Sequence, residues 1–287
     1  MRQSHNPFYM TVSCQSRPGI IAAVSTYLSD RNCDIIESAQ FVDHDGEQFF
    51  LRMAFDAPDA IRSEAVLVEE LQPIVTRFAM TLTVRDARRR PKILIMVSKF
   101  GHCLNDLLYR HSIGALPVDI VGVVSNHDDF KSLVESHDIP FHHLPVSART
   151  KREQEIHLME IVEWNDVELV VLARYMQVLS QDLCTRMAGR IINIHHSFLP
   201  SFKGAKPYHQ AYKRGVKLIG ATAHYVTDDL DEGPIIEQEV ARVDHSMSPD
   251  DLVAIGRDVE SVVLARAIRL HIEARVMVHD HRAIVLR

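Results

Sequence analysis

The run Ile93-Leu94-Ile95-Met96-Val97 decides the fold of the larger part of this chain. Five consecutive apolar residues are typical of a strand that is buried on both faces, as in a parallel sheet covered by helices. Similar runs alternate with segments of helical periodicity further along the chain, at residues 120–124, 141–144, 169–172 and 191–194. This alternation predicts an α/β unit built on a doubly wound, mostly parallel sheet.

The rest of the chain continues this unit, which we place at residues 92–287. Residues 219–226 and 235–243 are expected to form two more strands. A helix is predicted to begin at Ser248 and Pro249, because a capping hydroxyl, an early proline and the acidic pair that follows all suit a helix N-terminus. Its apolar positions are expected at Leu252, Ile255, Val259, Val262 and Val263. A hairpin is predicted at residues 275–286.

A smaller unit precedes it, at residues 1–86. Strand-like segments are expected at residues 9–14, 34–42, 48–55 and 80–84, and helical spacing at residues 20–28 and 64–75. The order βαββαβ in fewer than about 90 residues is the ferredoxin-like arrangement. The charged segment 87–91, with three consecutive arginines and a proline, is predicted to be a solvated linker.

Composition narrows the possible functions. The chain has 287 residues, of which 46% are hydrophobic and 24% charged, as expected for two globular domains. Its net charge of −6 argues against a nucleic-acid partner. No apolar run is long enough for a bilayer, and the N-terminus lacks an apolar signal core, so we predict a cytoplasmic protein without a membrane partner. The four cysteines are scattered, which favours reduced thiols.

Catalytic chemistry is predicted at the end of the strand at residues 191–194. Asn193 and His195 are two residues apart and are expected to share one face of an extended backbone, with His196 on the opposite face. An amide and an imidazole at a strand end can polarise a carbonyl and transfer a proton. Asp231, in an acidic turn, could supply a carboxylate. No serine or cysteine nucleophile stands beside them, which favours direct attack on an acyl group.

Other interpretations of these residues have to be weighed. Taken singly, Asn193 fits a turn or cap, and Asp231 fits an Asx-turn. The adjacent histidines, including His142 and His143, would face opposite sides of a strand, and the chain has no His-Glu-x-x-His motif. We therefore expect no metal.

Four motifs together carry a family resemblance over about residues 93–273. They are Asn193-Ile194-His195, residues 197–204, His224-Tyr225-Val226 and residues 228–234. This part of the chain resembles the formyltransferase fold of enzymes that use 10-formyltetrahydrofolate. The resemblance implies that Asn193, His195 and Asp231 form a catalytic triad, and that 10-formyltetrahydrofolate is a substrate, with no tightly bound cofactor. It also implies folate contacts from Arg174, Tyr175, Met176, Gln177, Val178, Leu179, Asp228 and Gly233.

The acceptor of the formyl group distinguishes the members of this fold. The segment after the first strand of the larger unit keeps one glycine, Gly101, and carries bulky residues where transferases bind a phosphate. The motif at residues 102–108, the pair His195-His196 and the motif at residues 204–208, together with the layout of the chain, resemble the formyltetrahydrofolate deformylase family. That resemblance implies a hydrolase in one-carbon metabolism that releases formate, with His102 and Cys103 blocking the acceptor site. The two residues also fit an ordinary helix start.

Two alternatives to a hydrolase remain open from the sequence. A formyltransferase would pass the formyl group to an amine acceptor, and a folate-binding regulator would bind the cofactor without turnover. The metabolic role, purine biosynthesis or folate recycling, is also left open.

The smaller unit resembles the ACT domain, whose marker turn is Arg17-Pro18-Gly19-Ile20 here. The resemblance implies an amino-acid effector, with glycine or methionine as candidates, and a homo-oligomer, either a dimer or a tetramer. Ser16 replaces the usual aspartate before the arginine, so a purely structural role in oligomerisation is an equal alternative.

Overall fold

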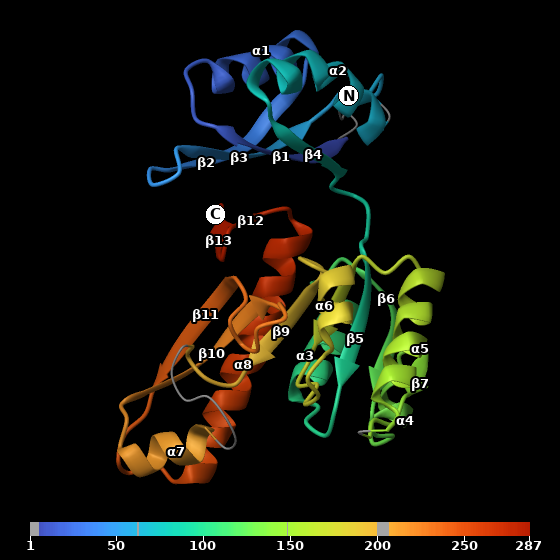
Figure 1. The fold of residues 1–287 in the computed structure, drawn as a ribbon, viewed down its shortest axis with the longest axis vertical. Coiled ribbons are helices and arrows are strands. Elements are labelled where there is room, and N and C mark those ends of the chain that lie inside the picture. Colours follow the sequence, from blue (N-terminus) through green and yellow to red (C-terminus); the bar gives the residue numbers. More distant parts are fainter. Residues whose placement is uncertain (1–5, 62, 148, 200–206) are drawn as a thin grey trace. The chain divides into compact units, whose positions relative to one another are not determined.

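The structure is a computed structural model that describes residues 6–61, 63–147, 149–199 and 207–287. Internal contacts divide the chain into two units (Figure 1). The first contains residues 1–90 together with the C-terminal segments 270–277 and 284–287, and the second contains residues 91–269 and 278–283. The sequence-based division into residues 1–86, 87–91 and 92–287 had assigned both C-terminal segments to the larger unit.

The first unit is built on a four-stranded antiparallel sheet with the strand order β2-β3-β1-β4. Its elements are β1 (Pro7–Gln15), α1 (Ile20–Asp30), β2 (Asp34–Asp43), β3 (Gln48–Asp56), α2 (Glu64–Phe78) and β4 (Thr81–Asp86). Alternate residues of β1, among them Met10 and Val12, are buried in one core with Leu28 of α1 and Leu67 of α2. The predicted ferredoxin-like order is confirmed.

The second unit is built on a seven-stranded sheet with the order β11-β10-β9-β8-β5-β6-β7. The strands are β5 (Lys92–Val97), β6 (Asp119–Ser125), β7 (Phe141–His143), β8 (Leu169–Leu172), β9 (Ile191–His195), β10 (Leu218–Tyr225) and β11 (Ile235–Arg242). Strands β9, β8, β5, β6 and β7 pair in parallel, whereas β10 and β11 are antiparallel additions. The predicted doubly wound, mostly parallel sheet is confirmed.

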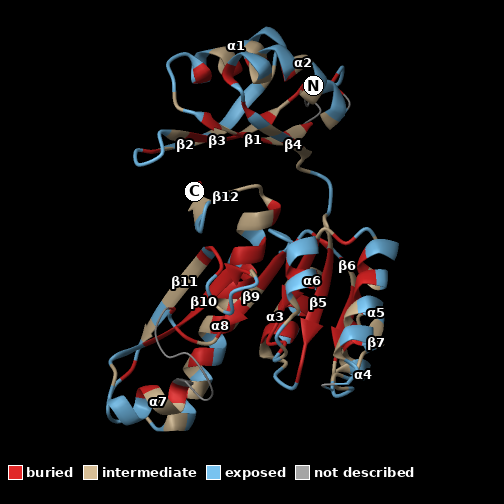
Figure 2. Cartoon of the chain, viewed as in Figure 1, coloured by how far each residue is buried: buried red, intermediate tan, exposed pale blue. Residues whose placement is uncertain are grey.

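Helices cover this sheet because its central strands are apolar on both faces. They are α3 (His102–Ser112), α4 (Lys131–Glu135), α5 (Lys151–Trp164), α6 (Gln181–Arg186), α7 (Pro207–Arg214) and α8 (Pro249–Ile272). Leu94 and Met96 of β5 pack in one cluster with α5 and α6, while Ile93 and Ile95, which point to the other face, are equally buried. Figure 2 shows β5 and β9 as buried strands.

Helix α8 begins where its sequence predicts. The hydroxyl of Ser248 accepts a hydrogen bond from the backbone N–H of Asp251, and the Asp251 carboxylate accepts one in return from the backbone N–H of Ser248. This reciprocal pair is a capping box, which satisfies two donors at the helix start. None of the helices in the described ranges is long and apolar enough to cross a bilayer.

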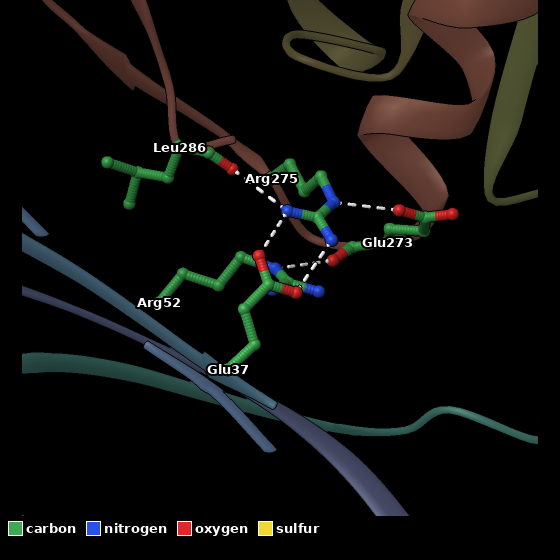
Figure 3. A network of polar contacts seen from close by, with 5 residues as sticks. All are labelled: Glu37, Arg52, Glu273, Arg275 and Leu286. Atoms are coloured by element: carbon green, nitrogen blue, oxygen red, sulfur yellow. Dashed lines mark hydrogen bonds and ion pairs between the residues drawn. The ribbon is translucent and has the colours of Figure 1, made fainter. Parts of the chain in front are cut away.

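The C-terminal segment joins the first unit through a network of charged side chains (Figure 3). Arg275 donates hydrogen bonds to both carboxylate oxygens of Glu37 in β2, at 2.7 and 2.8 Å, and to the carboxylate of Glu273 at 2.7 Å. Arg52 in β3 is completely buried and donates to Glu37 and to the backbone carbonyl of Glu273. One carboxylate therefore binds two guanidinium groups, and the segment that follows α8 is tied to the sheet of the first unit.

We predict that Arg275→Ala lowers the free energy of unfolding by about 1–3 kcal/mol, because it leaves Glu37 and the buried Arg52 with an incomplete network. Urea denaturation of the full chain would measure the loss. Arg266→Ala is the matched control, since Arg266 makes an exposed ion pair with Glu239, and such pairs contribute less than about 1 kcal/mol. Equal losses in the two variants would contradict a special role for the Glu37 network.

Candidate active site

A cavity of about 780 Å³ lies at the carboxyl edge of the sheet in the second unit. Ligands of open α/β sheets bind at this edge, where the segments that follow parallel strands converge. Here the walls come from the segments after β5, β8 and β9, from β10, from the turn at residues 226–231 and from α8. The polar residues used below are Asn193, His195, His196, His224, Asp231, His102, Arg174, Tyr208 and Glu260.

Strands β9 and β10 bring the first polar residues together. Asn193 and His195, two residues apart on β9, both line the cavity. Antiparallel pairing places His224 of β10 directly opposite Asn193, and the Asn193 Nδ2 atom lies 3.2 Å from His224 Nε2. The expected arrangement of an amide and an imidazole on one strand face is present.

The acidic turn brings Asp231 to the same place. Its Oδ1 atom lies 3.2 Å from Nδ1 of His195 and 3.9 Å from Nε2 of His224. Asp231 itself has a positive φ of 59°, in the left-handed region that aspartate tolerates better than most residues. Gly233 allows the turn to close, because a Cβ atom there would lie 1.8 Å from the backbone oxygen of Tyr225.

The protonation states of two of these groups follow from their contacts. The hydrogen bond from His195 holds the pKa of Asp231 below its ordinary value, so Asp231 is ionised at neutral pH. Burial lowers the pKa of His224, so this imidazole is neutral. Its Nδ1 lies 2.8 Å from the carbonyl oxygen of Tyr225 and must carry the proton. Its bare Nε2 therefore accepts from the Asn193 amide, which fixes the orientation of that side chain.

His195 has one nitrogen engaged and one free. Its Nδ1 faces Asp231, whereas its Nε2 is buried and has no hydrogen-bond partner among the described residues. An unpartnered polar atom in a buried position carries a free-energy cost. Because His195 lines the cavity, its Nε2 is a candidate to form a hydrogen bond with a ligand or a water molecule. The arrangement can move a proton at Nε2 while Asp231 stabilises the charged imidazole.

His196 corrects one expectation from the sequence. It does not point away from His195, because β9 ends at His195 and the alternation of an extended strand ends with it. Both residues line the cavity, and their rings stack with centroids 5.0 Å apart. Burial, together with the positive charge of Arg174, lowers the pKa of His196 to about 4. It is a neutral imidazole at neutral pH.

A second polar group, around Glu260 of α8, was missed in the sequence. Glu260 is 1% exposed and contacts His102 at 2.8 Å, Tyr208 at 2.7 Å and Arg174 at 3.3 Å. The positions through which the helix was expected to continue all lie in α8, but Glu260 was given no role. One signal in the sequence could have identified Glu260. It lies three residues before Val263 and four before Leu264, which places its carboxylate on the buried face of an amphipathic helix.

This group is a poor cation site in spite of its ligand types. Atoms of His102, Cys103 and Glu260 lie within 4.8 Å of one another. Both oxygens of Glu260 are already engaged by its partners, one of them the cationic Arg174. Burial raises the pKa of Cys103, so its thiol stays protonated, whereas metals bind the thiolate.

The predicted folate contacts divide into two sets. Residues 174–179 and Asp228 all line the cavity, whereas Gly233 does not. The backbone N–H of Met176 donates a hydrogen bond to Ser98 Oγ, which holds the loop after β8 in place. Arg174, at the start of this loop, has a positive φ of 65°. Gln181 donates to Asp228 at 3.3 Å.

The other predicted site residues can be placed as well. His102 lines the cavity, but Cys103 lies buried behind it. In the first unit Arg17, Pro18 and Gly19 are exposed and Ile20 is buried, with Gly19 at a φ of 94° as the N-cap of α1. The part of the 197–204 motif from residue 200 onward lies outside the described residues.

We predict that stability falls as the pH decreases from about 6.5 to 4. An unfolded histidine binds a proton near pH 6.5, whereas folded His196, whose pKa is lowered to about 4, binds one only at the lower end of this range. Folded His224, whose pKa is also lowered, acts in the same direction. The unfolded state therefore binds more protons across this range, with a slope of up to about 1.4 kcal/mol per pH unit for each histidine. His196→Asn should make the slope of the denaturation midpoint against pH shallower; an unchanged slope would contradict the assignment.

Comparison with known proteins gives the family. The formyl transferase family model matches residues 91–268, and the ACT domain model matches residues 8–67. A formyltetrahydrofolate deformylase of Corynebacterium sp. (strain P-1) is 50% identical over 281 residues, which cover 97% of each chain. A solved structure of a formyltetrahydrofolate deformylase from Burkholderia mallei is 53% identical and has a TM-score of 0.93, with 98% of this chain and 100% of that chain covered.

Transferases share the fold of the second unit. A solved structure of glycinamide ribonucleotide transformylase 1 from Symbiobacterium toebii is 30% identical, with a TM-score of 0.64. It covers 69% of this chain and 95% of its own, whereas the deformylases match nearly the full length of both units. The chain therefore belongs to the formyltetrahydrofolate deformylase family.

Proposed function

We propose that the protein hydrolyses 10-formyltetrahydrofolate to tetrahydrofolate and formate. The observation that carries this proposal is the unpartnered, buried Nε2 of His195, which lies in the cavity wall beside Asn193 while Nδ1 faces an ionised Asp231. A base with one free nitrogen, an amide donor and a carboxylate partner suit direct attack of water on an acyl carbon. The names of the close relatives support the same reaction.

The steps follow from these groups. Water attacks the formyl carbon, and its proton passes to Nε2 of His195 while Asp231 stabilises the resulting imidazolium. The formyl oxygen becomes an oxyanion, which the second amide N–H of Asn193 stabilises, since the first is bound to His224. The bond between the formyl carbon and N10 then breaks, and His195 returns the proton to N10. Formate and tetrahydrofolate leave, and no covalent enzyme intermediate forms.

The pterin of the substrate is proposed to bind against residues 174–179 and Asp228. Their lining of the same cavity as Asn193 and His195 supports this assignment. The loop supplies apolar side chains and backbone groups, and Tyr175 is fixed by a hydrogen bond from Gln154. Such a mixture of apolar surface and a few polar groups is typical of small-molecule sites.

Three substitutions test the catalytic assignment. Asn193→Ala removes an oxyanion donor and should lower kcat by about 10²–10³. His195→Ala removes the proton carrier, and Asp231→Asn removes the charge that stabilises it, so each should abolish most turnover, with a loss of at least about 10². Matched release of formate and tetrahydrofolate by the full chain, with no added amine, measures the effect.

A matched control separates catalysis from disruption of the turn. Asp229→Asn changes an exposed carboxylate two residues from Asp231, and it should retain far more activity than Asp231→Asn. Turnover near the wild-type rate in any of the three test variants would remove that residue from the mechanism. Release of tetrahydrofolate only after addition of an amine, with the formyl group recovered on that amine, would instead support the transferase alternative.

We further propose that the ACT unit binds glycine or methionine at the turn Arg17-Pro18-Gly19-Ile20, and that it supports a homo-oligomer. The exposure of Arg17 and the left-handed backbone at Gly19 support a turn that is open to a ligand. We predict that one of the two amino acids changes kcat or KM of the full chain and that Arg17→Ala, an exposed substitution, removes the response. No effect of either amino acid on activity or thermal stability would support the purely structural role.

A further inference from the structure

The carboxylate of Glu260 is a buried charge in the cavity wall that the proposed mechanism does not use. It is 1% exposed, yet it lines the cavity from α8. A buried carboxylate is costly unless donors satisfy it. Two donors form hydrogen bonds with Glu260: Tyr208 donates to Oε1, and His102 lies at hydrogen-bond distance from Oε2. Arg174 adds an ion pair, with its Nε 3.3 Å from Oε2.

These contacts keep Glu260 ionised. Burial alone would raise its pKa, but the hydrogen bond from His102, the positive charge of Arg174 and the hydrogen bond from Tyr208 together lower it. The partners are also fixed in position. The Tyr208 ring packs so closely on Gly256 of α8 that a Cβ atom there would lie 2.1 Å from it. The charge is therefore held at one point of the cavity wall.

The location of this charge is informative. Glu260 contacts His102, which is the first residue of α3. This helix directly follows strand β5 along the chain. The start of a helix after a parallel strand favours an external anion, because its backbone N–H groups and helix dipole are positive. Arg174 adds a full positive charge there, and Arg257, like Arg174, lies over the ring of Phe100. The chain places its own carboxylate among these cations.

We propose that Glu260 is an internal anion that occupies the acceptor side of the cavity and excludes amines that carry a phosphate, so that water receives the formyl group. This inference rests on the proposed hydrolysis and names the residue that sets its acceptor. The transferases of the same fold take a glycinamide ribonucleotide, as their name states. Here a phosphate would meet an ionised carboxylate, and Arg174, the buried cation of the group, is already paired with that carboxylate. Glu260 acts through His102 and Arg174, and it is a specificity-determining residue.

The test is the affinity of the full-length protein for inorganic phosphate, measured by isothermal titration calorimetry. Wild-type protein should not bind phosphate measurably at millimolar concentration. Glu260→Ala frees His102 and Arg174 for an anion and should raise the affinity by at least about tenfold, which corresponds to about 1.4 kcal/mol. Glu260→Gln removes the charge at constant size and should give a smaller gain in the same direction, which keeps the test valid if the alanine variant does not fold.

Two further variants show where phosphate binds and whether charge is the cause. Adding His102→Ala to the Glu260 variant should remove the gained affinity, whereas Glu239→Ala, which removes an exposed carboxylate, should leave the wild-type value. Affinity equal to wild type in both Glu260 variants, or a gain that survives the loss of His102, would overturn the proposal. Formate release by the wild-type protein is measured separately, so a failure of the proposed hydrolysis would be recognised independently of the phosphate result.

Discussion

The contact between His195 and Asp231 is the interaction on which the rest of the candidate site depends. The two residues are far apart in the sequence, and three structural features bring their side chains to 3.2 Å. Strand β9 ends at His195, the strained backbone at Asp231 turns its carboxylate inward, and Gly233 lets the turn pack on Tyr225 without a side chain in between. The contact fixes which nitrogen of His195 is engaged and which is left without a partner among the described residues, and this decides what the site can do with a proton.

Two of the carboxylates that line the cavity are proposed to have separate tasks. Asp231 lies where bond making is proposed, and Glu260 lies where an acceptor would enter. His196 stacks on His195 and is neutral at neutral pH, because burial and Arg174 lower its pKa. A neutral ring there adds no charge that would compete with the imidazolium of the proposed mechanism. Apolar walls strengthen the electrostatic effects of both carboxylates.

The sequence predicted the fold well because both units have regular hydrophobic patterns, and the two-residue spacing of Asn193 and His195 set their common face. The sequence-based prediction failed where the periodicity of a strand or helix ends, or where contacts between distant segments determine the position of a residue. His196 lies just past the end of β9, so strand alternation did not apply to it. Arg52 is a charged residue inside an apolar run, and Glu260 lies in a mixed polar and apolar stretch of α8; the partners of both come from distant segments. No local pattern could show that residues 270–277 and 284–287 join the first unit.

The central claim is that water itself attacks the formyl carbon, and isotope labelling tests it most directly. The purified protein would be given 10-formyltetrahydrofolate in ¹⁸O-labelled water without any amine, and the formate analysed by mass spectrometry. The account predicts rapid release of formate that carries one solvent oxygen, in step with tetrahydrofolate. Absence of formate, with the formyl group recovered on an amine once one is supplied, would contradict it.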